Sequence, residues 1–315
     1  MHIPDGFLSA GVAAGTWAAS AATVGFALRA ERRDPERVPA GTLGALSAFV
    51  FAAQMVNVPL VPGTSGHLVG GTLAAALVGP WRGIVVMAVV LAVQSLLFQD
   101  GGVTAFGANL LAMGVVGALG GHAVASLVAR LAPGGRGPVA GPVAGAFVAT
   151  LAGAALVALG LALSGLYPLF GVLPVLLALH VPIGLLEAAL TGATLGTVLR
   201  WRPDLVRGVQ AAAQPASRSA PVLGALVVAL AVAAFVAPFA SSLPDGLESA
   251  AERLGFADAA RAAWPSPLPD YAAPWLAVGR AGTALAGVLG TLVAAVLAWG
   301  LSRGAGTPQE GGPHR

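Results

Sequence analysis

The sequence contains no cysteine, no lysine and few charged residues of any kind. Without cysteine, the chain has no disulfide, thiolate metal site, iron–sulfur cluster or cysteine nucleophile. Without lysine, it has neither a Walker A phosphate loop nor a lysine that forms a Schiff base. The chain is therefore not by itself a P-loop ATPase.

The low charge also indicates the solvent in which the chain folds. Charged residues make up 9% of the 315 residues and hydrophobic residues make up 57%, whereas an ordinary soluble domain carries roughly 25% charged residues. The mean hydropathy is +0.85. We therefore expect most of the chain to lie in a lipid bilayer.

Apolar stretches of roughly bilayer-spanning length recur along the chain. They predict an all-α membrane protein, a polytopic helical bundle of about nine transmembrane helices, with a seven-helix body followed by two more. Eight spans remain an alternative if the 66–99 region contains a re-entrant segment. The predicted spans are 8–28, 41–60, 66–79, 84–99, 104–130, 139–164, 170–199, 220–240 and 274–301.

The distribution of arginine predicts the orientation. If the N-terminus lies outside, 13 of the 16 arginines fall on the cytoplasmic side, as the positive-inside rule requires. The C-terminus is then cytoplasmic. Because these arginines occupy separate loops without interleaved aromatic residues, nucleic acid is not an expected partner.

The composition divides the chain into four parts. We expect a membrane body over 1–205, a cytoplasmic linker over 206–219, a two-span domain over 220–302, and a disordered tail over 303–315. The two-span domain includes a polar outer segment at 241–273, which we expect either to cover or load a site on the body or to be a solvated loop.

His2 follows Met1 directly, on the predicted outer side. The α-amine of Met1, the amide nitrogen of His2 and the His2 ring Nδ1 can close adjoining five- and six-membered chelate rings. Three nitrogens then lie in one plane and need one more donor. Square-planar nitrogen sites suit Ni(II) or Cu(II), so this terminus is a candidate metal site, although a surface histidine with no such role is the alternative.

His67 is a candidate for the fourth donor. It lies in the segment Pro62-Gly63-Thr64-Ser65-Gly66-His67, which enters a predicted span from the same outer side as His2. A polar, glycine-rich entry at membrane depth is tolerated only where protein or a cavity satisfies its backbone. A satisfied core histidine remains the alternative.

Other polar residues within the spans are candidates for a proton relay, a helix contact or the orientation of ligands. His180 and Glu187 lie seven residues apart on one helix face, and they fit either a functional pair or a buried hydrogen bond that fixes a helix contact. Side chains that could orient loops or ligands or line a pathway include Asn57, Ser65, Asn109, Gln54, Gln94 and His122.

Three sequence segments resemble the CbiM/NikM family. They are Met1-His2-Ile3-Pro4-Asp5-Gly6-Phe7-Leu8, the run from Met55 to Leu68 that contains Gly63-Thr64-Ser65-Gly66-His67-Leu68, and the run from Leu97 to Asn109. His180 with Glu187 to Gly192 is similar to the closing helix of that family. The C-terminal part contains Pro244-Asp245-Gly246-Leu247-Glu248, which resembles the PDGLE segment of NikN/CbiN-type partners.

The resemblance implies the substrate-capture component of an energy-coupling-factor (ECF) importer for Ni²⁺ or Co²⁺. It implies Met1, His2 and His67 as metal ligands, a scaffold membrane subunit (CbiQ/NikQ type) and cytoplasmic ATPase subunits (CbiO/NikO type). The metal is the transported substrate, no cofactor is expected, and the chain is not an enzyme. The abundance of alanine, glycine and arginine without lysine suggests a GC-rich bacterial gene, and we expect the protein in the plasma membrane.

Three alternatives differ in function class. A secondary transporter would use His180 and Glu187 as a proton relay and would function alone in proteoliposomes with a pH gradient. A membrane enzyme is disfavoured because H-E-x-x-H and G-x-S-x-G are absent. In a structural membrane protein, all histidines would serve packing.

Overall fold

Helices dominate the computed structural model, which describes residues 1–34, 38–131, 137–206, 220–272 and 279–306. The predicted all-α polytopic class is confirmed, and a short hairpin is the only sheet within the described residues. Its strands, Val58–Val61 (β1) and Thr64–Gly66 (β2), pair antiparallel. The hairpin belongs to the segment that leads to His67.

Seven helical stretches within the described residues are long and apolar enough to cross a membrane, so the predicted count of nine is not confirmed. The predicted spans 41–60 and 66–79 correspond to shorter helices, Ala40–Gln54 (α2) and Gly71–Val78 (α3). Pro59, Pro62 and Gly63 prevent α2 from continuing, because proline lacks the backbone donor and Gly63 adopts a positive φ of 74°. The seven stretches are Ala10–Arg33, Pro80–Phe98, Phe106–Leu131, Gly137–Leu163, Leu169–Trp201, Pro221–Phe239 and Gly279–Gly304.

Several of these stretches contain more than one helix type. Three π-helical segments, Gln94–Phe98, Leu110–Gly120 and Val232–Val236, extend or join α-helices, and π-helical turns often occur at functional sites. The remaining α-helices are Ala10–Arg33 (α1), Pro80–Val93 (α4), Phe106–Asn109 (α5), Gly121–Leu131 (α6), Gly137–Leu163 (α7), Leu169–Trp201 (α8), Ala220–Ala231 (α9), Gly246–Leu254 (α10) and Gly279–Gly306 (α11).

The predicted linker and tail fall almost entirely outside the described residues, which omit 207–219 and 307–315. α11 continues through Gly306. The first residues of the segment predicted as a disordered tail are therefore helical, because the apolar helix carries them on.

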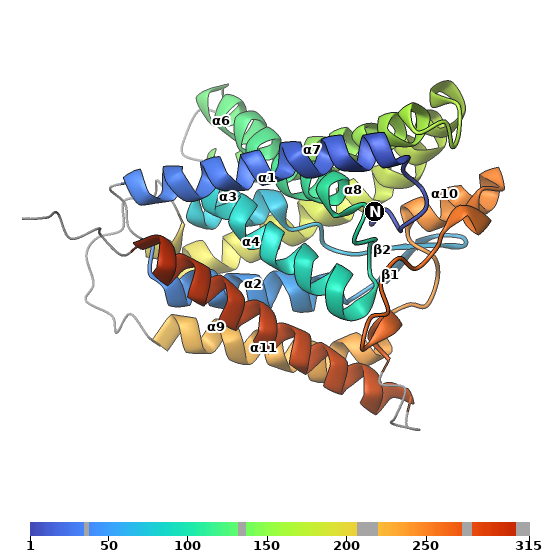
Figure 1. Ribbon diagram of the computed structural model, residues 1–315. Coiled ribbons are helices and arrows are strands. Elements are labelled where there is room, and N and C mark those ends of the chain that lie inside the picture. The colour runs from blue at the N-terminus through green and yellow to red at the C-terminus, as the bar shows by residue number, and fades with distance from the viewer. Residues whose placement is uncertain (35–37, 132–136, 207–219, 273–278, 307–315) are drawn as a thin grey trace, which may run out of the picture.

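The C-terminal helices α9 and α11 pack alongside α2 (Figure 1). Gly44 of α2 allows the closest approach, since a Cβ atom at this position would lie 2.7 Å from the carbonyl oxygen of Ala295 in α11. Small residues let helix backbones approach closely in lipid, where no hydrophobic force drives helices together. The two-span region is thus packed directly on the body.

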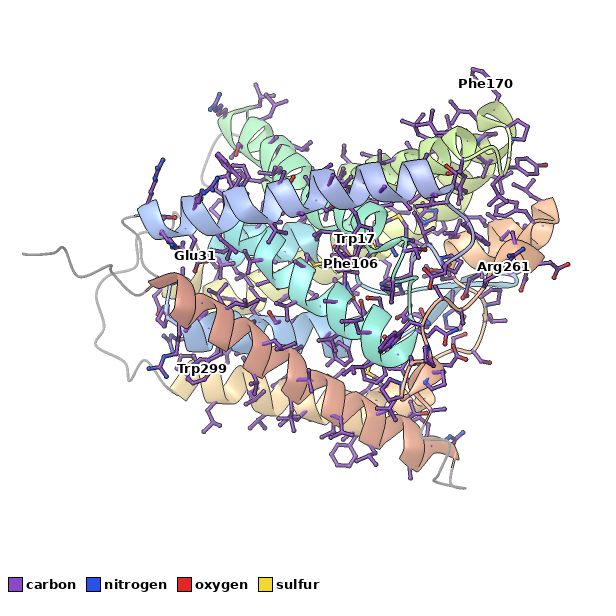
Figure 2. The ribbon with its side chains drawn as sticks, in the orientation of Figure 1. Trp17, Glu31, Phe106, Phe170, Arg261 and Trp299 are labelled. Atoms are coloured by element: carbon purple, nitrogen blue, oxygen red, sulfur yellow. The ribbon has the colours of Figure 1, made fainter. Side chains whose placement is uncertain are left out.

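Charged side chains mark both ends of the bundle. Figure 2 shows Arg261 at one end of the molecule and Glu31 and Trp299 at the other. At the Glu31 end, buried Arg82 forms ion pairs with Asp34 at 3.1 Å and Glu31 at 3.7 Å. The N-terminus lies toward the opposite end, beside the hairpin and α10 (Figure 1).

We predict that Gly44→Ala destabilises the protein by about 1–3 kcal/mol, because the added methyl group overpacks the contact with Ala295. The matched control is Gly15→Ala, since a Cβ atom at Gly15 meets nothing within 4 Å. Thermal unfolding in detergent measures both. Equal melting temperatures for the two variants would contradict this account of the α2–α11 contact.

Candidate metal centre

The first residues of the chain lie inside the protein. Met1 is 4% exposed and Ile3 is 1% exposed. The amide side chain of Asn109 holds Ile3 at both backbone groups, since its Oδ1 accepts from the Ile3 nitrogen at 2.7 Å and its Nδ2 donates to the Ile3 carbonyl at 3.0 Å. Asn109, predicted to orient ligands, therefore fixes the N-terminal segment.

Asp5 anchors the other end of this segment. Its Oδ1 accepts from the backbone nitrogen of Thr104 at 2.7 Å, and its backbone carbonyl accepts from the nitrogen of Arg261 at 2.8 Å. Residues 1–5 are therefore held between the loop after α4 and the outer segment of the C-terminal region.

The fold brings the rings of His2 and His67 into contact inside the protein. Their rings stack with centroids 5.4 Å apart and an interplanar angle of 23°, and both side chains are buried. One potential ligand atom from each of His2, His67 and Asp245 lies within 4.8 Å of the others. Residues 2, 67 and 245 are far apart in sequence, so the site depends on the complete fold.

His67 follows β2, and its loop is fixed by contacts on both sides. Its Nδ1 donates to the carbonyl of Leu68 at 2.8 Å, which leaves the Nε2 lone pair for a metal ion. Glu187 of α8 accepts from the backbone nitrogens of Val69 at 2.5 Å and Gly70 at 2.9 Å. Glu187 thus fixes the loop that follows His67.

The ring of His2 lies between two polar side chains. Its Nε2 is 3.2 Å from Oε1 of Gln94, and its Nδ1 is 3.1 Å from Oδ1 of Asp100. The hydroxyl of Tyr271 donates to the other carboxylate oxygen of Asp100 at 2.6 Å. The outer segment therefore reaches the His2 environment through Tyr271.

Asp245 is the site residue that sequence reasoning missed. It is the N-cap of α10, where its Oδ1 accepts from the backbone nitrogens of Leu247 and Glu248, and its Oδ2 accepts from the α-ammonium group of Met1. The capping pattern Asp-x-x-Glu was visible in the sequence. Nothing in the sequence indicated that its carboxylate also meets Met1.

Burial and local charge shift the pKa values of these groups. Burial lowers the pKa of His67 to about 4, and the nearby α-ammonium of Met1 adds to this effect. Burial also lowers the pKa of His2, although Asp100 opposes the shift. For Asp245, burial favours the neutral acid, but the charge and hydrogen bond of the Met1 ammonium hold its pKa well below the usual range.

The remaining predicted residues support the loops or lie beside them. Ser65 Oγ donates to the carbonyl of Leu243 at 2.6 Å, and the Asn57 carbonyl accepts from Ser241 at 2.9 Å, so both hold the C-terminal region. His180 Nδ1 donates to the Leu176 carbonyl at 2.7 Å.

Within the described part of the chain, His180 Nε2 has no hydrogen-bond partner. The His180 ring packs on Gly246, where a Cβ atom would lie 2.7 Å from its Cε1. No hydrogen bond joins His180 to Glu187 among the described residues. The structure therefore gives no hydrogen bond that supports the predicted pair within the described residues.

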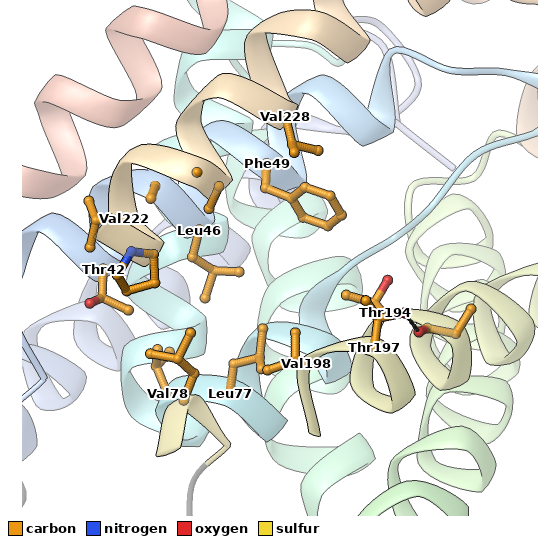
Figure 3. Close-up of a pocket in the computed structure, with 16 residues that line it drawn as sticks. Thr42, Leu46, Phe49, Leu77, Val78, Thr194, Thr197, Val198, Val222 and Val228 are labelled. Atoms are coloured by element: carbon orange, nitrogen blue, oxygen red, sulfur yellow. Dashed lines mark hydrogen bonds between the residues drawn. The ribbon is translucent and has the colours of Figure 1, made fainter. Parts of the chain in front are cut away.

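A separate cavity of about 470 Å³ lies between α2, α3, α8 and α9 (Figure 3). Apolar side chains such as Phe49, Leu77 and Val198 line it together with threonines. The described residues that form this lining include no ionisable side chain, so the cavity offers no metal ligands.

Comparisons with known proteins identify two matching families. The family described as "Cobalt uptake substrate-specific transmembrane region" (CbiM) matches residues 2–205, and the PDGLE domain matches residues 219–305.

Curated relatives match either nearly the whole chain or about two thirds of it. The "Putative fused nickel transport protein NikMN" of Archaeoglobus fulgidus is 34% identical over 98% of this chain and 100% of its own length. The "Fused nickel transport protein NikMN" of Rhodobacter capsulatus is 33% identical over 96% of this chain and 97% of its own. The "Cobalt transport protein CbiM" of Sorangium cellulosum is 36% identical over 67% of this chain and 96% of its own.

A crystal structure described as a truncated transition metal transporter matches with a TM-score of 0.56 and 32% identity. The match covers 64% of this chain and 99% of that chain.

We predict that the metal-free protein loses stability as the pH falls from 7 toward 4. An unfolded histidine takes up a proton near pH 6.5, whereas folded His67 resists protonation down to about pH 4. Acid therefore favours the unfolded chain over this interval.

Thermal unfolding at pH 7, 6 and 5 measures the effect, and His67→Gln should reduce the slope of melting temperature against pH. The exposed His122 supplies the matched variant, His122→Gln. If His67→Gln and His122→Gln follow the wild-type slope equally, the burial of a neutral His67 ring is contradicted.

Proposed function

The chain belongs to the CbiM family of cobalt-uptake substrate-specific transmembrane regions and carries a PDGLE domain, and we propose that it captures Ni²⁺ or Co²⁺ for import. Its homologues are nickel and cobalt transport proteins, which supports a transporter component that is not an enzyme. The proposal concerns the site, the metal and the way in which uptake is powered.

In the proposed complex, four nitrogens bind the metal in one plane. They are the Met1 amine, the His2 amide nitrogen, His2 Nδ1 and His67 Nε2. The observation that carries this proposal is the burial of the Met1 amine beside stacked His2 and His67. The neutral His67 ring presents Nε2 because its Nδ1 donates to Leu68.

The donor set favours particular ions. Square-planar nitrogen coordination suits Ni(II), while Zn²⁺ prefers tetrahedral sites and Ca²⁺ or Mg²⁺ prefer oxygen ligands. Metal binding displaces protons from the amine and the amide, so acid should weaken it. The ion would enter from the extracytoplasmic side in our proposed orientation, with the N-terminus outside.

The proposed source of energy is a set of partner subunits. With no lysine, the chain has no Walker A motif, and we propose a scaffold membrane subunit with cytoplasmic ATPase subunits, as in ECF-type importers. The proton-relay alternative is less well supported, because both oxygens of Glu187 accept from the loop that follows His67. This contact suits a residue that supports the metal site.

The outer segment of the PDGLE domain is proposed to close this site. It contacts all three loops that surround the metal ligands, through Arg261 to Asp5, Tyr271 to Asp100, and Pro244 to Ser65. These contacts favour the covering role over a freely solvated loop.

We predict that purified protein with its native N-terminus binds Ni²⁺ with the absorption of a planar, low-spin complex. A version with one glycine added before Met1 should lose this absorption. Its Kd for Ni²⁺ should rise at least about tenfold, which corresponds to a loss of about 1.4 kcal/mol of binding free energy. The extension converts the Met1 amine into an amide nitrogen, which takes it out of the chelate without changing the identity of any side chain.

A parallel Co²⁺ titration compares the two metals, and His67→Gln with its control His122→Gln tests the fourth donor. Equal Ni²⁺ binding by the native and extended proteins would overturn the N-terminal site.

A further inference from the structure

Two buried glutamines connect the ring of His2 to the backbone that follows His67. Gln54, the last residue of α2, is 2% exposed, and Gln94, the first residue of the π-helical turn after α4, is 0% exposed. Their side chains form an unbroken chain of hydrogen bonds between His2 and Val69. We call these two side chains the glutamine relay.

The direction of the relay is fixed at its Val69 end. Nε2 of Gln54 lies 2.6 Å from the Val69 carbonyl oxygen, which can only accept a hydrogen bond. Gln54 therefore turns its NH₂ group to Val69 and its Oε1 toward Gln94. Nε2 of Gln94 donates to that oxygen at 2.7 Å, so Oε1 of Gln94 faces His2.

The orientation of Gln94 determines which nitrogen of His2 keeps its hydrogen. Oε1 of Gln94 lies 3.2 Å from His2 Nε2 and can only accept, so Nε2 carries a hydrogen. The remaining nitrogen, Nδ1, is then the one that yields its lone pair to a metal. Only Nδ1 closes a six-membered chelate ring with the amide nitrogen of the same residue.

Asp100 makes this constraint necessary. Its Oδ1 lies 3.1 Å from His2 Nδ1, and a carboxylate favours a hydrogen on the nitrogen it faces. If Gln94 were free to reverse its amide, its NH₂ group would donate to Nε2 while Nδ1 donated to Asp100. That arrangement satisfies a neutral ring but occupies the nitrogen that the chelate needs.

We propose that Gln54 and Gln94 are positioning residues that keep His2 in the form that offers Nδ1 to the metal. The proposal rests on the proposed function, because it concerns the same site. The relay ends on the peptide between Val69 and Gly70, whose nitrogen donates to Glu187, so it also ties the orientation of His2 to the loop that carries His67. Partners of this kind orient metal-binding histidines and typically change metal affinity by about 10- to 100-fold.

The test compares Gln54→Met with Gln54→Glu. Methionine removes the acceptor that orients Gln94, and we expect Ni²⁺ affinity to fall by about 10- to 100-fold. As a buried, protonated acid, glutamate donates its hydroxyl to the Val69 carbonyl and still accepts from Gln94 Nε2 through its other oxygen, so it should restore binding close to the wild-type affinity. Gln99→Met is the matched control, because Gln99 is an exposed glutamine directly after the π-helical turn that begins at Gln94.

Nitrogen-15 NMR of histidine-labelled, metal-free protein supplies a readout that a packing defect would not change. Wild type and Gln54→Glu should keep the hydrogen on His2 Nε2 across the pH range, whereas Gln54→Met should shift it to Nδ1 at high pH. If Gln54→Met does not fold, Gln94→Glu takes its place. As a buried acid, it donates its hydroxyl to Gln54 Oε1, and its other oxygen can only accept from His2 Nε2, so it should retain both the Nε2 hydrogen and Ni²⁺ binding.

The outcomes separate this proposal from the proposed function. Unchanged Ni²⁺ binding by Gln54→Met, equal losses in Gln54→Met and Gln54→Glu, or loss of the Nε2 hydrogen in Gln94→Glu would overturn the relay while the capture function stands. Failure of the wild type to bind Ni²⁺ would overturn the function. In that case the NMR measurement, which needs no metal, still tests the relay.

Discussion

In the metal-free protein, the ion pair between the α-ammonium of Met1 and Asp245 is the interaction on which the rest of the structure depends. A charged chain terminus is costly to bury unless it is paired and hydrogen-bonded, and removing one partner of a buried pair typically costs about 3–5 kcal/mol. Here the terminus of the body meets a carboxylate of the PDGLE domain. The first and last parts of the chain must therefore assemble together before the site is complete.

This requirement explains the arrangement of the outer segment. Asp245 serves two purposes with its two oxygens, since Oδ1 caps α10 and Oδ2 holds Met1. Further contacts from Arg261 to Asp5 and from Tyr271 to Asp100 secure the N-terminal segment and the loop beside His2. The outer segment and the proposed metal ligands thus share one hydrogen-bond network. Gly44 lets α11 approach α2 closely at the membrane level, which keeps that segment over the body.

The all-α membrane class could be predicted from sequence, because hydropathy is a local property. Met1 and His2 could be named as candidate ligands for the same reason, since their chelate involves neighbouring residues. The juxtaposition of His2 with Asp245, and the direction of the Gln54–Gln94 relay, depend on contacts between distant residues. The predicted span at 41–60 is not confirmed at its full length for a related reason. Apolar composition alone does not reveal that the chain after α2 leaves the helix to form the hairpin that leads to His67.

X-ray absorption spectroscopy at the nickel edge, on Ni²⁺-loaded protein with its native N-terminus, tests the central claim most directly. The account predicts four nitrogen neighbours in a planar arrangement, with the pre-edge signature of a site that lacks axial ligands. His67→Gln should alter that first shell, while the exposed His122→Gln should leave it unchanged. A six-coordinate site dominated by oxygen neighbours in the wild-type protein would contradict the account.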